Sequence, residues 1–160
     1  MSEEKLQKAL DIAMRYLSLR PRSEWEMRNR MRRSFDADIV KAVLQELRER
    51  DLVNDTSFAQ YWADNRTDFS PRSRRLVIQE LRRKGVSAEE ANNAVADMDD
   101  QVTAHEAGRK KARSFKGVDH VEFYKKLSSF LRNRGYSYDV IESVVQSLRQ
   151  ELNLRLEGCL

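Results

Sequence analysis

A repeat with a period of about fifty residues constrains the fold of this chain more than any other feature. Residues 31–47, 81–98 and 131–148 match one another, and Met31, Leu81 and Leu131 open the three copies. The match runs through a helix end, a turn and the next helix; the first copy is one residue shorter at its turn and lacks the glycine. This shared register favours a tandem array, with chance similarity among amphipathic helices as the alternative. The other matching positions are Phe35, Val86 and Tyr136; Asp36, Ser87 and Ser137; Asp38, Glu89 and Asp139; and the pairs Val43/Leu44, Ala94/Val95 and Val144/Val145.

The composition and the apolar spacing predict an all-α protein. Only 5 Gly and 2 Pro occur in 160 residues, and apolar residues recur at helical spacing without a sustained two-residue alternation. We expect helices at residues 4–19, 23–33, 36–50, 55–68, 71–84, 87–99, 101–115, 119–134 and 137–152.

Polar residues and glycines mark the ends of these helices. Ser23 and Ser87 each precede a glutamate by three residues, the spacing of a capping box. Gly85 and Gly135 follow basic helical runs and predict C-terminal caps in the left-handed region. The remaining expected N-caps are Asp36, Asp55, Ser137 and Ser70, the last directly before Pro71 at a first helical position.

The helices group into three units of three. We expect one unit at residues 1–54, a second at 55–100 and a third at 101–160, which ends in a short C-terminal tail. Repeats of this kind stack neighbour on neighbour, so we expect three tandem three-helix repeats in an elongated, curved array that exposes a long surface.

Several function classes find little support in the sequence. The single cysteine, Cys159, predicts no intramolecular disulfide and a reducing cytoplasmic location. His105 and His120 have no third ligand at a metal spacing, and no phosphate loop or nucleophile motif occurs, so we expect no enzyme, cofactor or metal site. No run of 18 apolar residues and no signal peptide is present, so we expect no membrane association.

Charge follows the period of the repeat. Residues 20–33 carry six basic and two acidic side chains, and residues 66–84 carry seven and two. Residues 87–108 carry six acidic side chains and no Lys or Arg. Either these are solvated faces of different sign, or they form a bipolar surface that grips a phosphodiester backbone or another charged polymer.

The middle unit carries a distinctive motif within residues 51–66 and 70–87. Its residues are Leu52-Val53-Asn54-Asp55, Phe58-Ala59, Trp62, Arg66, Arg75-Leu76, Glu80-Leu81 and Lys84-Gly85-Val86. In this motif the chain resembles the RecX family of bacterial regulators of the recombinase RecA, and the flanking units extend the resemblance over nearly the whole chain. Ser70-Pro71 stands where many members have Gly-Pro.

This resemblance implies a negative modulator of RecA. Family members lie in the groove of the RecA–DNA filament and restrain its extension, ATP hydrolysis, strand exchange and coprotease activity. The implied partners are the RecA filament and, more weakly or through RecA, single- and double-stranded DNA. We expect the protein to be a monomer.

Basic side chains are the candidate binding residues for RecA and DNA. Helical spacing places Arg75, Arg82 and Arg72 on one face, although Arg75 and Lys84 have the alternative of pairing with Glu80, Glu89 or Glu90. We expect Phe58, Trp62, Leu76 and Leu81 in the core, and Trp25 either in the core or as a stacking platform. The candidates are Arg66, Arg72, Arg74, Arg75, Arg82, Arg83, Lys84, Lys110, Lys111, Arg113, Lys125, Lys126 and Arg132.

Two other functions stay open from the residues alone. One is an independent, sequence-nonspecific DNA-binding helical module, which would bind DNA tightly without RecA and weaken with salt. The other is a helical adaptor for an acidic protein partner.

Overall fold

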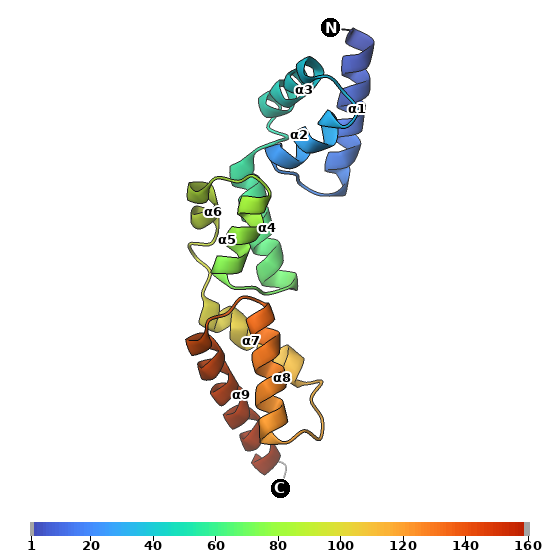
Figure 1. Ribbon diagram of the computed structural model, residues 1–160. Helices are drawn as coiled ribbons and strands as arrows, with labels where there is room; N and C mark the ends of the chain where they lie inside the picture. Colours follow the sequence, from blue (N-terminus) through green and yellow to red (C-terminus); the bar gives the residue numbers. More distant parts are fainter. Residues whose placement is uncertain (1, 159–160) are drawn as a thin grey trace. The chain divides into compact units, whose positions relative to one another are not determined.

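The computed structural model describes residues 2–158, and over that span the backbone forms nine α-helices and no strand (Figure 1). The all-α prediction is therefore confirmed. The helices are α1 (Glu3–Leu19), α2 (Glu24–Arg32), α3 (Ala37–Glu49), α4 (Asp55–Phe69), α5 (Arg74–Arg83), α6 (Ala88–Ala94), α7 (Asp100–Ala112), α8 (His120–Asn133) and α9 (Tyr138–Gly158).

The chain divides into two compact units, and the division passes through the middle of α4 and α5. The first unit runs to Ala63 and takes in Ile78–Ala96, and the second contains Asp64–Val77 and the chain from Asp97 onward. The second trio of helices, α4–α6, therefore contributes to both units, which means that its neighbours in sequence complete its packing.

Helices α1, α2 and α3 pack around one core in the first unit (Figure 1). The apolar face of α3 is buried, including Val43, Leu44 and Leu47, and it meets Met27 and Met31 of α2. Ala9 and Ala13 of α1 are fully buried, since small side chains allow the helices to approach closely. Burial of this helical stripe holds the trio together.

Helices α7, α8 and α9 form the corresponding core in the second unit (Figure 1). Leu127, Leu131 and Leu148 are buried there. Gly108 allows α7 to approach α9, because a Cβ at this position would lie 2.9 Å from Leu148 Cδ1. The Tyr136 hydroxyl lies 2.9 Å from Thr103 Oγ1 in this core, and burial raises the pKa of Tyr136 to about 12.

Several helix starts follow the sequence prediction. Ser23 forms the complete capping box with Glu26. Ser87 Oγ accepts the backbone N–H of Glu90 at 3.2 Å, and Ser137 Oγ accepts that of Val140 at 3.4 Å. Asp36 occupies its N-cap position without a side-chain cap hydrogen bond.

The predicted cap at Ser70-Pro71 is wrong, because α5 begins at Arg74. Ser73 caps it, and its Oγ accepts the N–H of Leu76 at 3.1 Å. The Ser70 hydroxyl instead accepts a hydrogen bond from Arg134. The helix therefore begins after the predicted position, with Ser73 in place of Ser70 as its cap.

The predicted helix at 87–99 is also too long, since α6 ends at Ala94. Asp99 caps the following helix by accepting the N–H of Gln101 at 2.9 Å.

The predicted N-cap role of Asp55 is wrong as well. Asn54 caps α4, and its Oδ1 accepts the N–H of Ser57 at 3.1 Å. The Asp55 carboxylate instead accepts the N–H of Glu24 at 2.9 Å, at the start of α2. A residue of α4 thus caps a helix 31 positions earlier in the chain.

Gly85 and Gly135 have φ angles of 81° and 89°, which confirms their predicted left-handed conformation. Each also lies against the start of another helix. A Cβ on Gly85 would lie 2.4 Å from Trp25 Cβ, and a Cβ on Gly135 would lie 2.8 Å from Leu76 Cβ. Only glycine satisfies both the backbone conformation and the close approach.

The starts of α2 and α5 are held in the same way. At the first junction Ser23 Oγ donates to the Lys84 carbonyl at 2.7 Å, beside the Glu24–Asp55 hydrogen bond. At the second junction the Ser73 N–H donates to the Arg134 carbonyl at 3.0 Å, and the Arg74 N–H donates to Asp100 Oδ1 at 3.0 Å. The repeat therefore encodes the docking of one helical trio on the next.

Among the described helices, none is long and apolar enough to cross a membrane. Cys159 lies outside the described residues.

Candidate functional site

Helix α5 supplies four exposed arginines, two at each end. Arg74 and Arg75 lie in the second compact unit, and Arg82 and Arg83 lie in the first. Arg75 Nη2 donates to the Gly135 carbonyl at 3.4 Å, and Arg82 Nη1 donates to the Val86 carbonyl at 2.9 Å. These two arginines therefore contact nearby turns while both residues remain exposed.

Lys84 is half-buried and pairs with a residue of the first helical trio. Its Nζ lies 3.4 Å from Glu26 Oε2. The alternative of an intramolecular ion pair therefore holds for Lys84, but its partner is Glu26 and not Glu80, Glu89 or Glu90. Lys84 thus belongs to the first junction.

Glu26 is buried and gathers several cations. Arg20 donates to both of its oxygens, at 3.1 and 2.5 Å, and Arg22 Nη1 lies 4.0 Å away. Burial by itself raises the pKa of Glu26. Two effects act in the opposite direction and outweigh burial: hydrogen bonds from Arg20 and the Ser23 N–H, and the positive charges of Arg20 and Lys84. The pKa of Glu26 is therefore below its ordinary value.

Trp62 lies beside the same cations. Arg20 Cζ is 5.6 Å and Lys84 Nζ is 5.5 Å from the centre of its ring, within the range of cation–π attraction. Phe58 and Leu81 are buried as predicted, whereas Trp62 and Leu76 are only partly buried. Trp25 is 44% exposed, so it is not a core residue. Its Cβ lies directly against Gly85.

The second unit contains a basic groove with aromatic walls, about 330 Å³ in volume. Lys110 and Lys111 of α7 line it, and both are exposed. Lys111 Nζ lies 5.5 Å and Arg134 Cζ 5.1 Å from the centre of the Phe130 ring. Phe69, at the end of α4, lines the other side and is 78% exposed. An exposed aromatic ring beside lysines is a combination that binds single-stranded nucleic acid.

The other candidate cations lie outside this groove. Lys126 pairs with Glu122 at 3.0 Å and lies 5.8 Å from the Phe115 ring. Arg113, Lys125 and Arg132 are exposed. Arg66 and Arg72 are half-buried and have contacts within the fold.

Acidic residues near residue 100 have structural roles. Asp99 caps α7, and Asp100 accepts the N–H of Arg74. Charge reversal at either position would therefore disturb helix starts. Asp97 is exposed and is the cleaner position at which to test the acidic surface.

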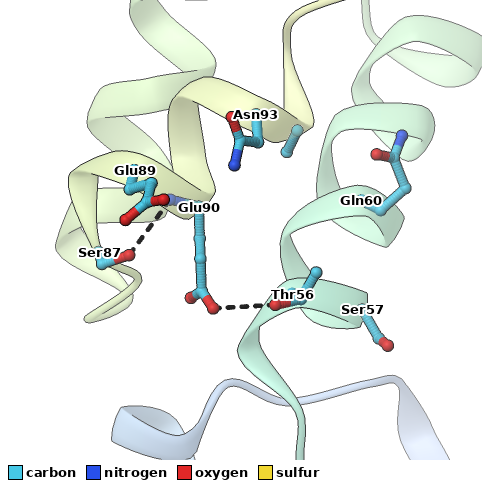
Figure 2. Close-up of a pocket in the computed structure, with 8 residues that line it drawn as sticks. Thr56, Ser57, Gln60, Ser87, Glu89, Glu90 and Asn93 are labelled. Atoms are coloured by element: carbon cyan, nitrogen blue, oxygen red, sulfur yellow. Dashed lines mark hydrogen bonds between the residues drawn. The ribbon is translucent and has the colours of Figure 1, made fainter.

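A polar pocket lies between the start of α4 and α6 in the first unit (Figure 2). Glu90 reaches from α6 to Thr56, whose hydroxyl donates to it at 2.8 Å. Because Glu90 is engaged there, Ser87 forms only half of the expected capping box. The lining residues carry two carboxylates and no cation, so the pocket is unsuited to phosphate.

The histidines form no metal cluster in the part of the chain that the structure describes. His105 Nε2 lies 3.2 Å from Ser147 Oγ and 3.2 Å from Glu151 Oε1. Glu151 also accepts hydrogen bonds from Arg109. This is a local polar network between α7 and α9.

Sequence reasoning missed Phe69, Phe130 and Arg134 as parts of the groove, and Glu26 as the partner of Lys84. The only advance signal was Phe69 itself, an aromatic residue next to Ser70-Pro71 in an expected connection. Phe130 and Arg134 are four residues apart in one expected helix, but Lys111 becomes a neighbour of Phe130, and Lys84 a neighbour of Glu26, only through folding.

The fold and the basic surfaces define an all-α protein built from tandem three-helix domains. Family models match all three: the first RecX three-helix domain at residues 9–47, the second at 54–95 and the third at 99–145. The chain belongs to the RecX family.

Relatives over nearly the full chain agree with this assignment. The protein named regulatory protein RecX from Chlorobium limicola is 33% identical over 151 residues, 94% of this chain and 95% of its own. Its namesake from Amycolatopsis mediterranei is 33% identical over 153 residues, 93% of this chain and 87% of its own. The crystal structure of RecX from Lactobacillus salivarius has the same fold, with a TM-score of 0.74 at 22% identity, covering 93% of this chain and 99% of that one.

Proposed function

We propose that this protein is a regulator of RecA that acts by binding, without catalysing a reaction of its own. The observation that carries the proposal is the match of all three helical trios to the three RecX domains, at one-third identity to regulatory proteins over nearly the whole chain. The protein binds in the groove of the RecA–DNA filament and restrains filament extension, ATP hydrolysis, strand exchange and coprotease activity, in the cytoplasm and as a monomer.

The exposed cations supply the electrostatic part of this binding. Arg74, Arg75, Arg82 and Arg83 lie along α5, and Lys110 and Lys111 line the groove beside Phe69. Cations of this kind attract a polyanionic filament and raise the rate of encounter. The remaining candidates stay predictions: Arg66, Arg72 and Lys84 are half-buried, and Arg113, Lys125, Lys126 and Arg132 are exposed outside the groove.

The decisive experiment is a titration of the protein into RecA from the same organism during ATP hydrolysis that depends on single-stranded DNA. Inhibition at ratios well below equimolar supports action on growing filaments. Unchanged hydrolysis at an equimolar ratio and physiological salt would exclude the proposal.

The basic groove favours a second candidate function, that of an independent DNA-binding module. Lys110, Lys111 and Arg134 meet Phe69 and Phe130 there, with no carboxylate among the lining residues. A labelled oligothymidine tests it without RecA. Tight, salt-sensitive binding together with unchanged ATP hydrolysis would favour this candidate over the RecA regulator.

A further inference from the structure

A second groove lies between α2 and α3 of the first trio, about 580 Å³ in volume. Its floor is apolar: Phe35 and Ala37 supply the accessible part, whereas Val40 and Leu44 are only 5% and 3% exposed. Val40 and Leu44 also belong to the core of the trio, so the floor of the groove is held in place by core packing. The groove is thus a preformed feature of the first trio.

The walls of this groove are cationic on both sides. Arg28 and Arg32 lie one helical turn apart on α2, while Lys41 and Arg48 lie two turns apart on α3. No carboxylate lines the groove. Like charges one turn apart on a helix, such as Arg28 and Arg32, cost stability, and the carboxylate of Glu24 offsets only Arg28.

The carboxylate of Glu24, next to the groove, shows how the arginines of the two walls bind an acidic side chain. Glu24 Oε1 accepts hydrogen bonds from Arg28, at 3.2 Å, and from Arg48. Arg32 and Lys41 form no ion pair among the described residues. The groove therefore keeps cations on both walls with capacity for further carboxylates.

The combination of floor and walls selects the occupant. A nucleic-acid backbone would satisfy the cations but would leave the apolar surface of Phe35 and Ala37 uncovered, and Phe35 is only partly exposed, which limits base stacking. A peptide segment with acidic and apolar side chains satisfies both parts of the groove. From Ala37 to Arg48 the wall extends about 16 Å, which matches three turns of a helix.

We propose that this groove is a docking site for an acidic, amphipathic helical segment of a partner protein. Apolar side chains of the segment cover Phe35 and Ala37, and its carboxylates pair with Arg32 and Lys41. The proposal goes beyond the regulation of RecA and does not depend on it.

The test uses the full chain and a fluorescent synthetic helical peptide of about 12 residues, with leucines on one face and glutamates on the others. Binding is measured by fluorescence anisotropy at physiological salt. The double variant Arg32→Glu/Lys41→Glu is expected to weaken binding about tenfold or more, because two wall charges are reversed. The matched control is Lys8→Glu/Arg15→Glu, which reverses two exposed charges on α1 and is expected to change the affinity by less than about twofold.

Two further probes separate this groove from general attraction between opposite charges. A peptide with serines in place of the leucines keeps its charge and is expected to bind about tenfold more weakly. The variant Ala37→Trp places a bulky side chain at the groove without changing any charge, and it is expected to weaken the binding of the peptide that carries leucines.

Three results would overturn the proposal. They are equal loss of affinity in the two double variants, equal affinity for the serine and leucine peptides, and preferential binding of a labelled dodecathymidine that depends on Arg32 and Lys41. Circular dichroism and urea unfolding of each variant establish that it is folded. The activity of RecA is not part of the readout, so failure here leaves the proposed function standing.

Discussion

The carboxylate of Asp55 caps a helix to which it does not belong: its Oδ1 accepts the backbone N–H of Glu24 at 2.9 Å. Asp100 does the same for Arg74 at 3.0 Å. In both cases the first turn of one three-helix domain supplies a cap to the second helix of the domain before it. Neighbouring domains in this family member therefore stabilise each other through backbone groups that a lone domain would leave to water.

Replacing Asp55 tests this cap directly. Asp55→Ala is expected to lower the free energy of unfolding by about 1 to 2 kcal/mol, because the Glu24 N–H loses its acceptor. Asp55→Asn keeps an oxygen acceptor and is expected to cost less. Burial and the nearby charges of Glu24 and Glu90 raise the pKa of Asp55, although the Glu24 N–H and Arg28 act in the opposite direction, so its negative charge is not the main benefit. Urea unfolding measures both variants, and an equal loss for Asn and Ala would contradict the capping role.

Gly85 and Gly117, two of the three left-handed glycines among the described residues, offer a matched comparison. Both have positive φ, but a Cβ on Gly117 would meet nothing within 4 Å, whereas one on Gly85 would collide with Trp25. Gly117→Ala is expected to cost about 1 kcal/mol from backbone strain alone. Gly85→Ala is expected to cost at least about 2 kcal/mol and to change the fluorescence of Trp25, since α2 must move. If Gly85→Ala and Gly117→Ala lose similar amounts of stability in urea unfolding, the close approach of Gly85 and Trp25 does not contribute to stability.

Stability should depend on pH through Glu26. Its pKa lies below the ordinary value when the protein is folded, so its stabilising effect is complete above the pKa of the unfolded chain and is lost as the pH falls through the folded pKa. Glu26→Gln is expected to destabilise the protein by about 2 kcal/mol at pH 7, because Arg20 and Lys84 lose their shared partner. The difference from the parent protein should shrink as the pH falls below about 5. Urea unfolding across this range measures it, with the exposed Glu3→Gln as the control; a difference that does not vary with pH would contradict the ion-pair role.

The third domain can be tested at its buried Tyr136–Thr103 hydrogen bond. Tyr136→Phe is expected to cost about 1 to 2 kcal/mol, because the buried Thr103 hydroxyl loses its partner. The double variant Tyr136→Phe/Thr103→Val should cost less than the sum of the single variants. Ultraviolet titration should show one tyrosine that ionises near pH 12, in line with its raised pKa, and Tyr136→Phe should remove it. Strictly additive costs would indicate that the two hydroxyls do not interact in solution.

The sequence was sufficient for the parts of the molecule that depend on neighbours in the chain. The helices, the left-handed glycines and the cap at Ser23 follow from local hydrogen bonding and from apolar spacing within a few turns. The residues in the middle repeat also predicted the family. Even there, the cap predicted at Ser70-Pro71 is wrong: Ser73 caps α5, and the Ser70 hydroxyl accepts a hydrogen bond from Arg134, a residue 64 positions away.

Tertiary structure alone decided which distant groups become partners. Asp55 is 31 residues from Glu24, and Ser23 is 61 residues from Lys84. Phe69 joins Lys110 and Lys111 in one groove although all three are exposed residues without a shared motif. The sequence alone determined the helices and the repeat because each helix forms from contacts within a few residues, whereas the caps between domains and the grooves arise only when packed cores bring separate helices to within hydrogen-bonding distance.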